Sequence, residues 1–133
     1  MNIQQSVKER YEQGAQAREE ALCCPVDYDP QYLKIIPQEV LDKDYGCGDP
    51  SQYVRQGETV LDLGSGGGKI CFIASQVVGK AGQVIGVDMT PDMLDMAKKM
   101  RLWWLKKLAM TMSASNAGIL KTSKLTLIWL MLI

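Results

Sequence analysis

The sequence predicts an α/β fold built on a parallel sheet, because two short apolar runs flank a segment of helical periodicity between residues 59 and 90. Residues 60–63 have the apolar character that a parallel strand covered on both faces requires. Residues 83–88 form a second run of this kind, which ends in an acid. A crossover of this length between two apolar strands implies a right-handed strand–helix–strand unit.

The segment between the two strands begins with a glycine-rich turn and continues as a helix. Residues 64–68 hold four glycines in five positions, which lets the backbone turn sharply and lets a ligand approach without meeting a Cβ atom. Apolar residues then recur on one helical stripe: Ile70, Ile73, Ala74, Val77 and Val78. Gly79 is the predicted C-terminal cap. The N-terminus of the helix therefore points at the turn, and the sequence predicts a nucleotide-cofactor pocket there.

The spacing of the glycines decides which cofactor fits. A dinucleotide-binding fingerprint fails in both possible registers, because Lys69 and Cys71 stand where its final glycine or alanine belongs. A phosphate-binding loop fails as well, since it would need glycine at Leu63 and a hydroxyl residue at Ile70. A nicotinamide-linked oxidoreductase is therefore a disfavoured alternative.

The remaining pattern is Asp62-x-Gly64-x-Gly66-x-Gly68, followed by Asp88 at the end of the next strand. It resembles motif I of the class I S-adenosylmethionine-dependent methyltransferases. This resemblance implies a Rossmann-like fold, present here only as its N-terminal part with the first two core parallel strands and their flanking helices. It implies S-adenosyl-L-methionine as cofactor. The cofactor-binding positions that it implies are Asp62, Gly64, Ser65, Gly66, Gly68, Asp88 and Met89.

The chemistry of the two acids suits this ligand. In the resembled family, the acid at the position of Asp88 holds the ribose hydroxyls, and a carboxylate can accept both hydrogens of a vicinal diol. Asp62 lies where it can attract the ammonium end of the methionine moiety, directly or through water. Because the sulfonium is cationic and no phosphate is present, a turn flanked by acids is more reasonable than one lined with lysines.

Cysteines upstream of the turn narrow the resemblance. The pair Cys23-Cys24, the segment Tyr45-Gly46-Cys47-Gly48 and the segment at residues 86–90 are similar to the arsenite methyltransferases and their close relatives, over about residues 21–99. The resemblance implies that thiolates of Cys23 or Cys24 and of Cys47 hold trivalent arsenic, whose lone pair attacks the cofactor methyl group. The alternative is that these are ordinary loop thiols, and Cys71 inside the cofactor helix is predicted to be a packing residue.

A zinc site is a weak alternative explanation for these cysteines. Zinc would normally have four ligands, often in Cys-x-x-Cys pairs with histidine, and the sequence has no histidine and no such pair. We therefore expect no metal site. The resembled family also holds arsenic with later cysteines, which would lie beyond Met100, where this sequence has none.

The N-terminal region carries weaker patterns. An apolar line of Ile3, Val7 and Tyr11 predicts a mostly exposed helix over residues 3–20. In the resembled family the segment before the first core strand often folds over the cofactor as a lid, and Tyr11 could serve there. The following expectations are a loop over residues 21–28, broken by Pro25 and Pro30, a short helix over residues 37–41 and a turn-rich link at residues 44–50.

The sequence changes character at about residue 100, after a helix start at Thr90-Pro91-Asp92. Residues 1–99 carry ten basic and fifteen acidic side chains, whereas residues 100–133 carry five basic side chains, no acid and all three tryptophans. We hypothesise that residues 100–133 are foreign to the fold, for example translated out of frame. The alternative is a membrane-surface or partner-binding helix. The apolar, β-prone end is too short to cross a bilayer but could cause self-association.

The predicted organisation has three segments. Residues 1–56 form a helical lid and cysteine-bearing segment, residues 57–99 the cofactor-binding start of a methyltransferase domain, and residues 100–133 an atypical tail. No signal peptide is visible, so we expect a cytoplasmic protein with its four cysteines reduced.

The expected function is S-adenosylmethionine-dependent methyl transfer by a truncated, arsenite methyltransferase-like enzyme. Its partner would be a small-molecule methyl acceptor, for which arsenite is the candidate. We expect no nucleic-acid partner and no membrane-spanning segment. The alternatives are a small-molecule methyltransferase of the quinone or sterol type and a non-catalytic fragment that keeps only the cofactor turn.

Overall fold

The computed structural model describes residues 2–18, 20, 26–46, 48–114 and 126–131, and the predictions for Cys23, Cys24 and Cys47 lie outside them. Its elements, in chain order, are helices α1 (Ile3–Gln16), α2 (Pro30–Leu33) and α3 (Gln38–Asp42), the 3-10 turn η2 (Pro50–Tyr53), strand β1 (Thr59–Leu63), helix α4 (Lys69–Val78), the 3-10 turn η3 (Gly79–Ala81), strand β2 (Gln83–Asp88), helix α5 (Pro91–Ala114) and strand β3 (Thr126–Met131). The predicted strand–turn–helix–strand order is confirmed.

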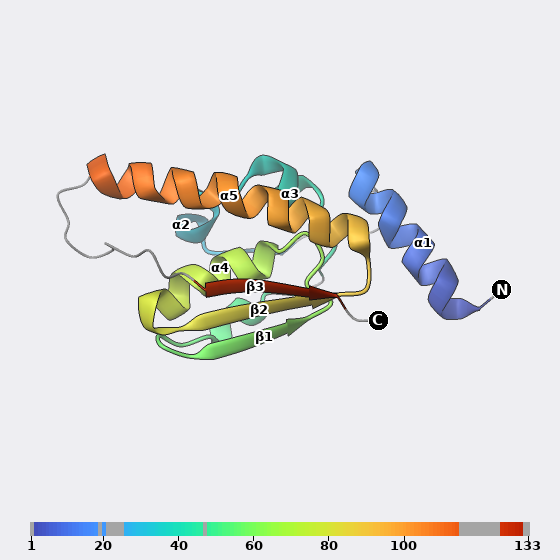
Figure 1. The fold of residues 1–133 in the computed structure, drawn as a ribbon, viewed down its shortest axis with the longest axis horizontal. Coiled ribbons are helices and arrows are strands. Elements are labelled where there is room, and N and C mark those ends of the chain that lie inside the picture. Colours follow the sequence, from blue (N-terminus) through green and yellow to red (C-terminus); the bar gives the residue numbers. More distant parts are fainter. Residues whose placement is uncertain (1, 19, 21–25, 47, 115–125, 132–133) are drawn as a thin grey trace.

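The sheet is parallel and has the order β1-β2-β3 (Figure 1). Val60 pairs with Val84 in the register of β1 and β2, and Ile85 pairs with Ile128 in that of β2 and β3. The two predicted core strands are both present, and the first begins one residue before the predicted run of residues 60–63. The third strand, β3, comes from the apolar end of the tail, which the sequence analysis described as β-prone. It pairs with β2 and is not part of a helix.

Helices α4 and α5 cover one side of the sheet (Figure 1). Phe72 of α4 and Trp104 of α5 are both fully buried, and their ring centroids are 5.4 Å apart. Helix α5 runs without a break through residue 100, so the helix that starts at Pro91 carries Trp104 into the core. The side chain of Trp104 thus packs with residues that precede the change in composition.

The other side of β1 is uncovered in the described part of the chain. Leu61 and Leu63 are 59% and 68% exposed, while Val60 packs against the core. The expectation that β1 is covered on both faces is therefore wrong for its outward face, because no described helix lies against it. Two exposed leucines on an edge strand fit the prediction of self-association, which stays a prediction.

The N-terminal region differs from the sequence prediction at its element ends. Helix α1 ends at Gln16 rather than near residue 20, since Ala17 is already extended with φ −137°. Pro30, predicted to break a loop, is instead the first residue of α2, where its fixed φ suits a helix start and the Asp29 side chain caps the helix. Within the described residues, no helix is long and apolar enough to cross a membrane.

Candidate functional site

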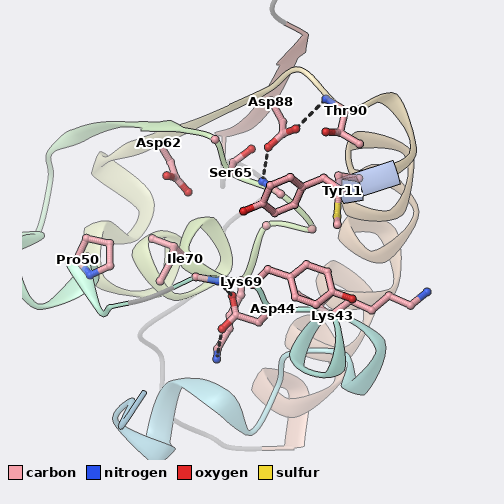
Figure 2. Close-up of a pocket in the computed structure, with 18 of the residues that line it drawn as sticks. Tyr11, Lys43, Asp44, Pro50, Asp62, Ser65, Lys69, Ile70, Asp88 and Thr90 are labelled. Atoms are coloured by element: carbon pink, nitrogen blue, oxygen red, sulfur yellow. Dashed lines mark hydrogen bonds and ion pairs between the residues drawn. The ribbon is translucent and has the colours of Figure 1, made fainter. Parts of the chain in front are cut away.

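A cavity of about 570 Å³ opens at the carboxyl ends of β1 and β2, where parallel α/β sheets place their ligands (Figure 2). One wall is the glycine-rich turn with the two strand ends. The other wall is formed by Tyr11 of α1 and by residues of the segment 43–50. All seven residues expected at a cofactor line this cavity: Asp62, Gly64, Ser65, Gly66, Gly68, Asp88 and Met89.

The turn needs glycine for its backbone. Gly64, Gly66 and Gly68 have φ values of 74°, 53° and 92°, in the left-handed region that side chains with a Cβ atom rarely adopt. The amide N–H groups of Gly64 and Ser65 both donate to the Val87 carbonyl oxygen, at 2.7 and 3.0 Å. The turn is thus fixed to the end of β2, and α4 starts directly behind it.

Asp88 accepts a hydrogen bond on each of its carboxylate oxygens, one from the glycine turn and one from the residue before α5. Its Oδ2 accepts a hydrogen bond from the Gly66 amide, and its Oδ1 accepts one from the Thr90 amide, each at 2.8 Å (Figure 2). The residue is only 8% exposed. Since each carboxylate oxygen has two lone pairs, each retains one acceptor position for a ligand.

Asp62, at the end of β1, has a neighbour that the sequence analysis did not pair with it. The Cys71 thiol donates to Asp62 Oδ2 at 3.3 Å. Burial raises the pKa of the Asp62 carboxyl, the Cys71 hydrogen bond lowers it, and the nearby charge of Asp88 raises it further. The prediction that Cys71 is a packing residue is confirmed, because its side chain is fully buried in the core.

The thiol of Cys71 stays protonated for the same reasons. Burial raises its pKa well above the ordinary range, and the charge of Asp62 and the hydrogen bond to it act in the same direction. The signal for this contact was present in the sequence, since Asp62 ends the first strand and Cys71 lies within the first turn of the following helix. Both therefore flank the same glycine turn.

A buried hydroxyl gives a direct test of whether a polar ligand fits here. Ser65 Oγ lines the cavity and is buried, and it has no protein hydrogen-bond partner. Buried hydroxyls are normally paired, so an acceptor or donor on a bound molecule would satisfy it. The donor and acceptor set of the cavity therefore suits S-adenosylmethionine, with carboxylates for its diol and ammonium group and backbone amides and a hydroxyl for its polar atoms.

The second wall is fastened to helix α1. Tyr45 Oη donates to the Gly14 carbonyl oxygen at 2.7 Å, and Lys43 Nζ donates to the Ala15 carbonyl oxygen at 2.7 Å. Tyr11 lies across the cavity from Asp62 in Figure 2, on the helix that these bonds hold. The lid role of Tyr11 stays a prediction.

The same wall is bonded to the cofactor turn. Lys69, the first residue of α4, forms an ion pair with Asp44 at 2.8 Å (Figure 2). The Lys69 ammonium also lies 3.6 Å from the centroid of the Tyr28 ring. Sequence reasoning missed this pair, because the partners are far apart in the chain and neither stands in a motif that links them.

The structure does not describe the candidate arsenic-binding thiols. Cys23, Cys24 and Cys47 lie outside the described residues, while Gly46 and Gly48 line the cavity. No group of histidine, cysteine and acidic residues suited to a metal ion occurs among the residues that the structure describes.

Comparisons with known proteins agree with this geometry. A family model described as a methyltransferase domain matches residues 55–118. The arsenite methyltransferase of Halobacterium salinarum is 55% identical over 60 residues, which is 44% of this chain and 15% of that protein. The arsenite methyltransferase of Aquipseudomonas alcaligenes is 43% identical over 79 residues, which is 56% of this chain and 23% of that protein.

A solved structure matches a larger share of the chain. The crystal structure of an arsenic(III) S-adenosylmethionine methyltransferase from Chlamydomonas reinhardtii superimposes with a TM-score of 0.60 at 31% sequence identity. The match covers 83% of this chain and 33% of that one.

The family match spans the whole of β1, α4 and β2, and the matches in sequence and in structure together support a class I S-adenosylmethionine-dependent methyltransferase. Within this class it lies close to the arsenite methyltransferases, which supply the relatives and the superimposed structure described above. The chain spans between 15% and 33% of the length of these proteins.

Proposed function

We propose that this chain binds S-adenosylmethionine in the cavity beside the glycine turn and serves methyl transfer of the arsenite methyltransferase type. The observation that supports this most is the placement of two carboxylates, Asp62 and Asp88, at neighbouring strand ends on either side of a turn that only glycine can form. A cationic ligand without phosphate suits such a site.

Each wall residue has a proposed role. The free lone pairs of Asp88 accept the hydroxyls of the ribose, and Asp62 attracts the ammonium group of the methionine moiety. The Ser65 hydroxyl supplies one further hydrogen bond. Met89, which is 39% exposed at the end of β2, offers an apolar surface to the adenine ring. Tyr11 covers the cavity from α1.

The sulfonium of the bound cofactor supplies an electrophilic methyl group. A soft acceptor with a lone pair, such as trivalent arsenic, needs no general base, because placing donor and acceptor in line supplies most of the effect. Cys23 or Cys24 together with Cys47 are the candidate thiolates for the acceptor, as soft ligands suit a soft centre. The names of the relatives, which act on arsenite, support this acceptor over a quinone or sterol.

Isothermal titration with S-adenosylmethionine tests the cofactor part of this proposal. Asp88→Asn keeps the shape of the side chain but sets an NH₂ group against a backbone N–H. We expect it to weaken binding by roughly 10- to 100-fold, the equivalent of one lost hydrogen bond to a charged acceptor. Asp95→Asn is the matched control, since Asp95 is an exposed acid on α5 outside the cavity. Equal affinity of the wild type and Asp88→Asn would contradict the proposed role of Asp88.

A second assay separates the candidate acceptors. The chain is incubated with S-adenosylmethionine, a thiol and arsenite, and methylated arsenic is measured by chromatography with elemental detection. We expect product from the wild type and its loss in Cys47→Ser. Cofactor binding without product would instead favour a non-catalytic fragment, in keeping with the short share of its relatives that the chain spans.

A further inference from the structure

We propose that Lys69 is a positioning residue of the cofactor site, which, through its ion pair with Asp44, clasps residues 43–46, Gly48 and helix α1 over the glycine turn. The inference rests on the proposed cofactor site, because it concerns how that cavity is closed. Lys69 acts on the ligand through Asp44 and the wall that Asp44 holds, so it is not a catalytic residue.

The position of Lys69 is unfavourable unless a partner compensates it. A helix N-terminus carries a partial positive charge, so a lysine as the first residue of α4 meets repulsion rather than attraction. The Lys69 side chain is also 11% exposed, and burying an unpaired ammonium group is costly. The nearby carboxylate of Asp44, 14% exposed and 2.8 Å away, offsets both costs.

Asp44 is in turn tied into its own segment. The Gly46 amide donates to Asp44 Oδ1 at 3.3 Å, and the Tyr28 hydroxyl lies 3.4 Å from Asp44 Oδ2. The same hydroxyl donates to the Gly48 carbonyl oxygen at 3.0 Å. Asp44 therefore organises the loop that forms the second wall, while Lys69 fastens that loop to the cofactor helix.

The clasp extends from the loop to the lid helix. Tyr45 follows Asp44 and bonds to the Gly14 carbonyl oxygen on α1, the helix that carries Tyr11. A chain of contacts thus runs from the first residue of α4, through Asp44 and Tyr45, to α1. Because the cavity lies between these walls, opening the Lys69–Asp44 pair should loosen the lid and let a ligand leave faster.

Lys69 could instead bind the ligand directly, and the experiment must distinguish this role from the clasp. Lys69 lines the cavity, so its ammonium could bind an anionic part of the ligand once it is freed from Asp44. Under the clasp account, neutralising Asp44 loosens the wall and weakens binding. If Lys69 instead binds the ligand directly, neutralising Asp44 frees the ammonium group and strengthens ligand binding.

The first experiment measures S-adenosylmethionine dissociation constants and dissociation rates for four variants. Lys69→Met removes the charge but keeps the apolar stem, Asp44→Asn removes the opposite charge, Lys69→Arg keeps the pair, and Lys80→Met is the control because Lys80 is exposed on η3. We expect about ten-fold weaker binding, mainly through faster dissociation, for Lys69→Met and Asp44→Asn, a range typical of coupled sites. Lys69→Arg and Lys80→Met should bind like the wild type.

A double-mutant cycle then tests whether the two residues act as one unit. The double variant Asp44→Asn with Lys69→Met should bind no more weakly than either single variant, since each alone already opens the clasp. Additive losses, unchanged binding in Lys69→Met, or tighter binding in Asp44→Asn would each overturn the inference.

A second experiment needs no ligand, so its failure is distinct from failure of the proposed function. Hydrogen–deuterium exchange compares unliganded wild type with Lys69→Met. We expect faster exchange at the amides of residues 44–46 and 48 and of α1, with unchanged exchange in β1 and β2. Equal exchange in both proteins would show that Lys69 clasps nothing. Absence of S-adenosylmethionine binding by the wild type would instead count against the proposed function.

Discussion

The Cys71 sulfur lies 3.3 Å from Asp62 Oδ2, and this fully buried thiol donates a hydrogen bond to the carboxylate at the end of β1. The pair joins the core of α4 to the wall of the cavity. It also opposes the rise in the pKa of Asp62 that burial and the charge of Asp88 cause. The net direction is still upward, so the carboxyl that should meet the ammonium group of the cofactor has a pKa above the ordinary value for aspartate.

The pKa of Asp62 gives a prediction for stability and for binding. An acid whose pKa is raised on folding contributes stability that is present below its unfolded pKa and is lost as the pH rises through its folded pKa. Asp62→Asn should therefore raise the melting temperature of the unliganded protein at neutral pH, and the gain should vanish in acid. The same variant should weaken S-adenosylmethionine binding.

The control for this prediction is Asp95→Asn, an exposed acid on α5. Wild-type affinity for the cofactor should fall as the pH drops towards the raised pKa of Asp62, because a neutral carboxyl attracts no ammonium group. A variant that binds as the wild type does and melts no higher would contradict the assigned role of Asp62.

Cys71 should be inert towards alkylation in the folded protein. Its thiol is fully buried, and its raised pKa keeps it neutral, whereas the thiolate is the reactive form. After treatment with iodoacetamide under native conditions, mass spectrometry should find the Cys71 peptide unmodified, and the same peptide should react fully in denaturant. Equal labelling in both states would mean that the helix opens readily at the cofactor turn.

The contact between Gly14 and Tyr45 should be sensitive to one added methyl group. A Cβ atom at Gly14 would lie 2.9 Å from the Tyr45 ring, which must then move away from its hydrogen bond to Gly14. Gly14→Ala should lower stability by roughly 1–3 kcal/mol by overpacking, although alanine is the better helix former. Gln13→Ala, at an exposed neighbouring site, is the control. A Gly14→Ala protein more stable than the control would exclude this packing in solution.

Trp104 tests whether the region after residue 100 belongs to the folded core. Its ring is fully buried against Phe72, so Trp104→Ala should cost about 3–5 kcal/mol of unfolding free energy. Trp103, 43% exposed, is the matched control, and Trp103→Ala should change stability by well under 1 kcal/mol. Denaturant unfolding measures both. Equal, small effects would mean that the tail does not pack as described and would favour a segment foreign to the fold.

The central unit of the fold could be predicted because its signals are local. The period of the apolar residues changes at the glycine turn, and the capping residues Gly79 and Thr90 mark helix ends. Asp62 and Asp88 each end a strand, and parallel strands bring their carboxyl ends to one edge. The cavity wall on the turn side follows from these facts alone.

The second wall could not be predicted, because it depends on contacts between distant residues. The pair Asp44–Lys69 and the bond of Tyr45 to Gly14 connect segments that no shared motif links. The start of α2 was missed because proline signals a break in a loop as readily as the first residue of a helix. The third strand was anticipated only as a β-prone segment, since its pairing with β2 depends on the sheet.

The central claim is that S-adenosylmethionine occupies the cavity beside the glycine turn. The most direct measurement is a ¹⁵N–¹H correlation spectrum of the labelled protein, recorded during titration with the cofactor. We expect saturable shifts in the amide signals of Gly64, Gly66 and Gly68, whereas the signals of Gly57 and Gly79, which lie outside the cavity, should not change. A well-dispersed spectrum in which the three turn glycines do not move at millimolar cofactor would contradict it.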